Sequence, residues 1–345
     1  KSMIITILGF SVATFAVGLL PTYAVVGVLA PVFLISVRLI QGIFAGGEWG
    51  SGAVLTIESV PKPKRGLVSG FLQSGFSFGF FLAAISFQII TITFPGNLFE
   101  EFGWRILFFT GIIPGFVALF VRLSMDESPL WIKKIKDSGL EKTPLKSIIF
   151  GKIHRKEFLL CAAIMTGLVY MYHGSISILP TYLAQFGNYE KSQIALIMIY
   201  ATASSWVGMI ITGWLSQKIG RRKSMLIFVS ASILVSIPLA SAIMDNVYGL
   251  VLYVVVFAFV VSTASGPIPA YFSERFPTQI RNSAAGFSYN AGLIFGSWSP
   301  LIALYLMSSV PKQMAPVALG VNIIIGATIL IIPTLFSRET KDVDL

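Results

Sequence analysis

Three ionisable side chains inside long apolar runs are the residues best placed to do chemistry: Arg38, Glu48 and His173. An arginine at the centre of such a run costs about 2.5–3.5 kcal/mol on membrane-insertion scales, so its guanidinium must face other helices or water and find a partner. We expect Arg38 to bind a carboxylate ligand or to control a nearby proton site. The structural alternative is a fixed ion pair that joins two helices.

Glu48 follows Arg38 by ten residues. On one helix that spacing is about 15 Å along the axis and roughly 80° around it, so the two side chains are not expected to pair directly. A carboxyl group in low-dielectric surroundings holds its proton more readily than in water. This property suits a group that takes up and releases one proton per cycle. The alternative is a permanently neutral or hydrogen-bonded glutamate.

His173 lies beside Tyr172 and Ser175 in a polar interruption of another apolar run. Histidine titrates near physiological pH, so it can relay a proton or donate to a ligand oxygen, and a structural histidine is the alternative. Two amides, Gln73 and Asn290, lie in apolar runs of their own. They are candidates for hydrogen bonds to a ligand, together with Ser175, or for bonds that only tie helices together.

Charged residues also flank the loops between apolar runs, and six of them could form a gate: Glu58, Arg65, Arg221, Arg222, Glu274 and Arg281. Ion pairs among them would hold one side of the molecule shut and break when it opens. The alternative is that positive charge alone is needed there, for topology and lipid contact.

The composition indicates what kind of elements position these residues. The chain has 345 residues, of which 55% are hydrophobic and 12% are charged, about half the charged fraction of soluble domains. With a mean hydropathy of +0.82, a soluble enzyme and a disordered chain are excluded. The apolar runs are continuous rather than alternating, which favours a polytopic all-α membrane protein over a β-barrel.

The sequence predicts no enzyme active site and no cofactor. It contains one cysteine, Cys161, and two histidines that lie far apart in the chain, so neither an intramolecular disulfide nor a zinc site is expected. No nucleotide-binding loop, metal cluster or nucleophile–base pair is recognisable in the sequence.

About ten spans are long and apolar enough to cross a membrane. Their approximate ranges are 2–20, 31–57, 66–92, 104–123, 158–186, 192–216, 224–244, 247–273, 281–307 and 313–336. The longest polar stretch, 124–157, is rich in Lys and Arg and is predicted to be a cytoplasmic linker.

The positive charges predict the orientation of these spans. If the linker is cytoplasmic, 21 of the 25 Lys and Arg residues lie on the cytoplasmic side, three lie on the opposite side, and Arg38 lies within a span. This asymmetry places both termini in the cytoplasm. It also explains the net charge of +10 without a nucleic-acid partner.

An internal repeat predicts two related halves. The pattern Glu-x-x-Pro-x-x-x-Arg-x-x-x-x-Gly occurs at 58–70 and again at 274–286, and Lys-Ser-Met occurs at 1–3 and at 223–225. The second match lies two spans into the second half, so about two spans are expected to be missing before Lys1. We therefore expect a first bundle at 1–123 that lacks two spans, a linker at 124–157 and a six-helix bundle at 158–345.

At this point the sequence resembles the major facilitator superfamily. The segment 213–223, GWLSQKIGRRK, is similar to the loop signature of that family, with Gln217 where an Asp is common. Arg38-Leu-Ile-Gln-Gly42 is similar to its fourth-span signature, and Met125-Asp-Glu-Ser-Pro129 and Arg338-Glu-Thr-Lys341 to signatures that end each half. The resemblance implies six plus six helices in the intact fold.

A narrower resemblance links the chain to sialate and lactate proton symporters. It rests on Gly46-Gly-Glu-Trp-Gly50, Arg65-Gly66, Leu72-Gln-x-Gly75 and His173-Gly-Ser-x-x-x-x-Pro-Thr181. Ile176 and Ser177 stand where that branch usually has Gln-Asp, and Val169 stands where it usually has Asn.

The resemblance implies a secondary active transporter that carries an organic anion, such as a monocarboxylate or sialic acid, together with H⁺ by alternating access. The alternatives are a proton-coupled porter of a sugar or other small metabolite and, from another class, a non-transporting nutrient sensor. The expected partners are a small-molecule substrate, H⁺ and the lipid bilayer. We expect a monomer that crosses the plasma membrane several times.

Overall fold

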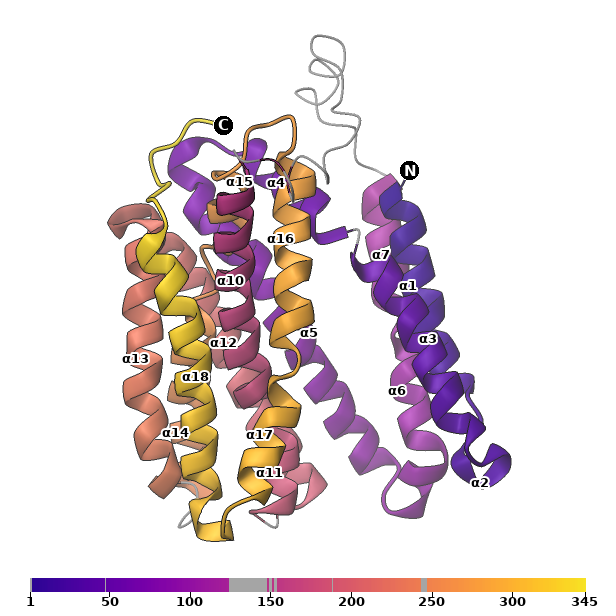
Figure 1. Ribbon diagram of the computed structural model, residues 1–345. Helices are drawn as coiled ribbons and strands as arrows, with labels where there is room; N and C mark the ends of the chain where they lie inside the picture. Colours follow the sequence, from indigo (N-terminus) through magenta and orange to yellow (C-terminus); the bar gives the residue numbers. More distant parts are fainter. Residues whose placement is uncertain are drawn as a thin grey trace. The chain divides into compact units, whose positions relative to one another are not determined.

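The structure, a computed structural model, describes residues 2–46, 48–123, 148, 151, 154–187, 189–242 and 247–345 (Figure 1). Within these residues the secondary structure is entirely helical. The chain divides into two compact units: Lys1–Gly52 with Ser86–Leu140, and Ala53–Ile85 with Glu141–Leu345. The linker predicted at 124–157 lies outside the described residues except for 148, 151 and 154–157.

The first unit is a small helical bundle. Its elements are α1 (Ser2–Leu19), α2 (Tyr23–Val26), α3 (Leu29–Gly46), the start of α4 (Glu48–Glu58), the end of α5 (Arg65–Thr93), the π-helix η2 (Phe99–Gly103), α6 (Trp104–Thr110) and α7 (Ile112–Leu123). Helix α1 packs against α3, α6 and α7. A β-carbon added at Gly115 would lie 1.9 Å from the Ser11 Oγ atom, so a small residue permits the approach of α1 and α7.

The second unit contains the rest of α4, η1 (Lys62–Lys64) and most of α5, followed by the second half of the chain. Its further elements are α10 (Arg155–Tyr172), η3 (His173–Ser177), α11 (Leu179–Gln185), α12 (Lys191–Ile219), α13 (Arg221–Ala242), α14 (Val247–Thr263), α15 (Ile268–Ser273), α16 (Arg281–Gly296), α17 (Ser299–Ser308), η4 (Lys312–Met314) and α18 (Ala315–Phe336).

Helix α10 lies at the centre of this unit, between α16 and α18 (Figure 1). Glycines allow these helices to touch: a β-carbon added at Gly292 would lie 2.4 Å from the β-carbon of Met165, and one at Gly167 would lie 2.5 Å from the Leu330 nitrogen. Close contact of small residues is how helices associate where lipid removes the hydrophobic driving force. Helices α12, α13 and α14 pack beside this core.

The structure supports the polytopic helical class. Eight helical segments of the described chain are long and apolar enough to cross a membrane. They cover eight of the ten predicted spans. The other two correspond to α1, whose apolar stretch Ile5–Leu19 is shorter, and to α13.

Three of these spans in the second half of the chain are broken helices, and the span 99–120 of the first unit is also divided, into η2, α6 and α7. The span 155–185 changes from α10 to the π-helix η3 and resumes as α11, which has a proline in its first turn. The span 249–273 is interrupted before α15, and the span 281–308 before α17. A break frees backbone groups from helical hydrogen bonds, so each break must lie against polar partners. The candidate sites lie at or near two of these breaks, those at η3 and α15.

Candidate functional site

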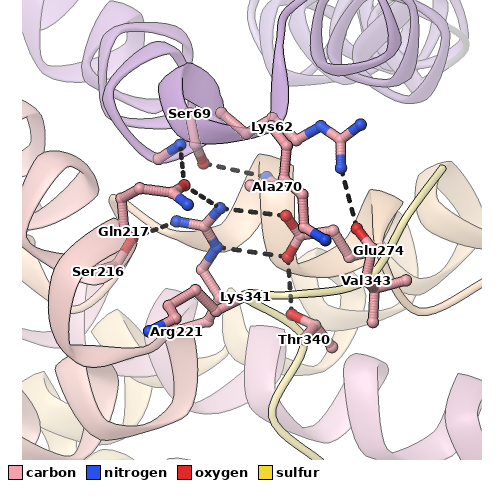
Figure 2. A network of polar contacts seen from close by, with 12 residues as sticks. Lys62, Ser69, Ser216, Gln217, Arg221, Ala270, Glu274, Thr340, Lys341 and Val343 are labelled. Atoms are coloured by element: carbon pink, nitrogen blue, oxygen red, sulfur yellow. Dashed lines mark hydrogen bonds and ion pairs between the residues drawn. The ribbon is translucent and has the colours of Figure 1, made fainter.

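A buried ion pair forms the centre of a polar network at one end of the second unit (Figure 2). Arg221 begins α13 and Glu274 directly follows α15, and both side chains are excluded from solvent, at 0% exposure. The Arg221 Nη2 atom lies 3.1 Å from Glu274 Oε1, and Nε lies 3.3 Å from Oε2. The pair is therefore a fork, the geometry that makes arginine–carboxylate contacts specific.

Arg221 makes two further hydrogen bonds. Its Nη1 atom donates to the Ser216 hydroxyl over 2.9 Å, and Nη2 donates to Gln217 Oε1 over 2.7 Å. The same Gln217 oxygen accepts the Gly66 amide over 3.0 Å, which joins α12 to α5. Gln217 stands where the family signature often has Asp. Its amide oxygen still accepts two hydrogen bonds, but it brings no charge.

The last residues of the chain complete the network. The Thr340 hydroxyl donates to Glu274 Oε2 over 2.7 Å. The Glu339 carboxylate accepts the backbone amides of Arg221 and Arg222, over 2.8 and 3.1 Å. A carboxylate at this position satisfies the free amides at the start of α13 and matches its helix dipole.

A left-handed glycine makes room for that cap. Gly220 has φ +105°, and a β-carbon there would lie 2.5 Å from Glu339 Oε2. Arg222 makes no side-chain bond to an acid among the described residues, and donates to the Leu335 carbonyl over 2.7 Å.

A second set of contacts joins the segment 58–70 to the second half of the chain. Arg281 forms an ion pair with Glu58, and its Nε atom donates to the Phe276 carbonyl over 3.0 Å. Arg65 Nη1 donates to the Val343 carbonyl over 3.0 Å. We call the contacts of Arg221, Glu274, Glu339 and Thr340, together with those between 58–70 and the second half, the end network.

An exposed ion pair closes the edge of the end network. Lys62 Nζ lies 2.9 Å from Asp344 Oδ1, and the Asp344 side chain is 91% exposed. The hydrogen bond and the charge of Lys62 lower the pKa of the Asp344 carboxyl below its usual value.

Helix α5 also comes into close backbone contact with the second half of the chain near these ion pairs. A β-carbon at Gly70 would lie 2.7 Å from the Met209 carbonyl oxygen, and one at Gly213 would lie 2.5 Å from the α-carbon of Gly70. The Ser69 hydroxyl donates to the Gly266 carbonyl over 2.9 Å and accepts the Ala270 amide over 3.0 Å. Helix α5 therefore contacts both α12 and α15 at this level.

A third buried cluster was not anticipated from the sequence. Arg275 Nη1 donates to the Tyr271 hydroxyl over 2.8 Å and to the Arg338 carbonyl over 3.2 Å, and its Nη2 atom forms an ion pair with Glu157. The sequence offered one clue, because Arg338 and Glu339 belong to the signature at the end of the second half. Among the described side chains, no group of three or more His, Cys, Asp or Glu could hold a metal ion.

The predicted binding residues of the second unit lie near the break in the α10 span. His173 begins η3, and its ring and that of Tyr172 lie 5.9 Å apart between centroids. Phe76 of α5 packs against both, with centroid distances of 5.2 Å to Tyr172 and 6.3 Å to His173. The Ser175 hydroxyl donates to the Met171 carbonyl in its own helix.

The two predicted amides differ in their surroundings. Gln73 is buried against Tyr289, and its Oε1 atom has no hydrogen-bond partner among the described residues. Asn290 donates to the Gly286 carbonyl one turn earlier in α16, over 2.9 Å. An unpartnered acceptor is the stronger sign of a binding role, because burial without a partner costs free energy.

The predicted residues of the first unit are Arg38 and Glu48. Arg38 is exposed in α3, donates to Gln41 Oε1 over 2.8 Å and lies 5.6 Å from the centre of the Phe108 ring. Gln41 in turn donates to the Thr14 hydroxyl over 2.7 Å. Within the described residues no carboxylate pairs with Arg38. Glu48 begins α4, and its side chain lies outside the described part of the structure.

Comparison with known proteins gives a consistent picture. A sequence profile of the Major Facilitator Superfamily matches residues 1–300. The inner membrane metabolite transport protein YhjE of Escherichia coli (strain K12) is 30% identical over an alignment of 355 residues, gaps included. The alignment covers 99% of this chain and 78% of that protein. The proline/betaine transporter of Salmonella typhimurium is 28% identical over 352 residues, with 99% and 69% covered.

Solved structures agree at the level of the fold. The proton:xylose symporter XylE, bound to 6-bromo-6-deoxy-D-glucose, superimposes with a TM-score of 0.74 at 16% identity. The match covers 98% of this chain and 80% of that one.

Proposed function

The chain belongs to the major facilitator superfamily, a family of multi-pass membrane transporters and not of enzymes, and on this premise we propose that it is a proton-coupled secondary transporter. It works by alternating access: two halves rock about a central site that opens to one side of the membrane at a time. The observation that carries this proposal is the end network, in which the segment 58–70 is held against the second half by bonds that rocking would break.

The end network is the cytoplasmic gate of this cycle. The bonds that cross from 58–70 to the second half include the ion pair of Glu58 with Arg281 and the hydrogen bonds of Gly66 to Gln217 and of Arg65 to Val343. Each links groups that water can solvate once the halves separate. The fork between Arg221 and Glu274 lies wholly within the second half. It holds the start of α13 against the end of α15, next to the segment 58–70.

The substrate is a small organic solute that carries a carboxylate. Arg38 supports this assignment, because its guanidinium has an amide and an aromatic face as neighbours but no described acid. The relatives named as proline/betaine transporters point the same way, since proline and betaine both carry a carboxylate. Monocarboxylates and sialic acid belong to the same chemical class.

The proton supplies the driving force. Glu48 and His173 are the groups that we assign to proton uptake and release. One pH unit provides about 1.4 kcal/mol per proton, and a membrane potential adds about 2.3 kcal/mol per net charge per 100 mV. A monoanion that moves with one proton carries no net charge and feels only the pH term. A zwitterion with one proton carries a positive charge and feels both.

Uptake by the full-length protein in proteoliposomes tests the proposal. The probes are radiolabelled L-proline, glycine betaine, L-lactate, N-acetylneuraminate and D-xylose, each with an imposed pH gradient, an imposed potential, or both. We expect saturable accumulation of at least one carboxylate solute that a protonophore abolishes. Accumulation of xylose alone would assign the sugar alternative instead. Uptake that ignores the protonophore would remove proton coupling.

The last part of the proposal concerns the oligomeric state, the membrane and the orientation of the protein. We propose a monomer in the bacterial plasma membrane, with both visible ends of the chain in the cytoplasm, as the 21 basic residues on that side favour.

A further inference from the structure

A buried asparagine in α18 bonds to the broken region of the α10 span. Asn322 is 0% exposed and lies in the largely apolar helix α18. Its Nδ2 atom donates to the Gly174 carbonyl over 3.1 Å, and its Oδ1 atom accepts the Tyr170 hydroxyl over 2.8 Å. Both ends of the amide are therefore used by residues at or just before the π-helical turn 173–177.

The position of these bonds gives the polar side chain a structural role. A π-turn widens the helix, and Pro180, in the first turn of α11, has no N–H to donate. The missing N–H deprives a carbonyl four or five residues earlier, at Ile176 or Ser175, of a helical donor where lipid offers none in exchange. In the same turn the Gly174 carbonyl accepts the Asn322 amide, and Tyr170 fixes the orientation of that amide.

The fit around this contact is tight. A β-carbon at Gly174 would lie 2.2 Å from Asn322 Nδ2 and 3.1 Å from the Ser299 β-carbon. Only a glycine lets the amide approach the backbone so closely. On the same helix, a β-carbon at Gly326 would lie 2.7 Å from Met171 Cγ, so α18 presses against α10 beside the contact as well.

We propose that Tyr170 and Asn322 are positioning residues for the transport site: together they hold the turn 173–177 and so set where His173 stands. This inference rests on the proposed function in one respect, because it takes His173 as part of that site. Neither residue needs to touch the substrate. They act through the turn, which also carries Ser175 and follows directly after Tyr172.

Three variants test the pair: Tyr170→Phe, Asn322→Leu and the double variant. Tyr170→Phe removes a single hydroxyl and is the milder change. The matched control is Tyr253→Phe, because the Tyr253 hydroxyl bonds to the Val235 carbonyl and joins α14 to α13 away from the turn. All four are compared with the wild type in the full-length protein.

The first readout is the KM and Vmax of protonophore-sensitive uptake of the solute that the wild type accumulates among labelled L-proline, glycine betaine, L-lactate and N-acetylneuraminate. Displaced binding groups should raise KM about tenfold, as expected for about 1.4 kcal/mol from one buried hydrogen bond. If a variant only reduces the amount of folded transporter, Vmax falls and KM stays unchanged. The double variant should be no worse than the worse single variant, since both act on one turn. An unchanged KM in both single variants would overturn the proposal.

The second readout does not depend on the substrate. Hydrogen exchange of the amides at 173–179 should quicken about tenfold in Tyr170→Phe and Asn322→Leu and stay unchanged in Tyr253→Phe. Equal exchange in all proteins would overturn the inference, whatever the transport result. A wild type that accumulates none of the four carboxylate solutes in a protonophore-sensitive way would contradict the proposed function instead, and the exchange data would still decide the role of the pair.

Discussion

Arg221 and Glu274 face each other across 53 positions of sequence, with their nitrogen and oxygen atoms 3.1 Å apart and both side chains at 0% exposure. Two charges removed from water are costly unless every donor and lone pair is satisfied. Ser216, Gln217 and Thr340 provide the additional bonds. The arrangement therefore depends on the whole set, and removal of either charged side chain should leave the other buried and unpaired.

Replacement of Arg221 by lysine should impair transport although the charge is kept. An ammonium group cannot bond to Glu274 through two parallel donors and also reach Ser216 and Gln217. We expect uptake to fall at least about tenfold, since hydrogen bonds to charged groups contribute roughly 1.5–3 kcal/mol each. Arg155→Lys, at an exposed arginine that begins α10, is the matched control and should stay within about twofold of wild type. Equal rates for the two variants would show that the fork is not needed.

Loss of the ion pair between Glu58 and Arg281 should favour opening at the end network. In Glu58→Gln the positive charge of Arg281 remains buried without its counter-ion, which destabilises the closed arrangement. We expect Ser273→Cys, in a Cys161→Ala background, to react with a membrane-impermeant maleimide about tenfold faster when Glu58→Gln is added. Ser273 is buried in the present structure. Labelling at the original rate would argue against a gate at this pair.

Glu48→Gln should separate proton coupling from substrate exchange. If Glu48 carries the proton, the variant loses accumulation driven by a pH gradient but keeps exchange of labelled for unlabelled substrate, because exchange needs no net proton movement. Gradient-driven accumulation and counterflow are measured in the same proteoliposomes. Unchanged accumulation with unchanged pH dependence would remove Glu48 from the mechanism.

The contact between Lys62 and Asp344 should persist across the physiological pH range. Because the pKa of Asp344 is lowered in the folded protein, its contribution to stability is complete above the unfolded carboxyl value of about 3.9. That contribution disappears as the pH falls through the lowered folded value. The difference in melting temperature between wild type and Asp344→Asn should therefore be constant from pH 8 to about pH 5.

Salt provides the control for that comparison. Because the pair is exposed, the difference should be small and should shrink further at high ionic strength. A difference that grows between pH 5 and pH 8 would point to another titrating group.

Gly220→Ala should destabilise the cap that joins α13 to the end of the chain. The positive φ costs an alanine about 1–3 kcal/mol, and its β-carbon would collide with Glu339. We expect a lower melting temperature and a lower uptake rate. Gly249→Ala, where a β-carbon would meet nothing within 4 Å, is the control. Because Gly249 lies in the first turn of α14, where alanine is a better helix former, the substitution should be neutral or stabilising. Equal behaviour of the two variants would contradict the importance of the cap.

The class, the spans and the family could be read from the sequence because they depend on local properties. A run of apolar residues is recognisable wherever its neighbours pack, and eight of the ten predicted spans are supported by length and composition. The loop signature at 213–223 is equally local, and it identified Arg221 and the unusual Gln217 before any contact was known.

The partners of the charged residues could not be read in the same way. Glu58 and Arg281 are 223 positions apart, and the repeat placed both beside loops without indicating which acid would meet which base. Glu339 was recognised only as part of a signature, without its partners. Arg275 and Glu157 were overlooked because nothing near them in sequence distinguishes a buried charge from a solvated one. The same holds for Asn322, which is a single amide in an apolar helix.

By itself, then, the sequence determined that the chain is a helical membrane transporter, since hydropathy, charge asymmetry and signatures are sums over neighbouring residues. Only the tertiary structure decided that Arg221 pairs with Glu274, that the last residues of the chain cap α13, and that Asn322 meets the turn at Gly174. These contacts join residues far apart in the chain. Their free energy depends on atoms within about 3 Å of one another, and only the packing of the helices brings such atoms together.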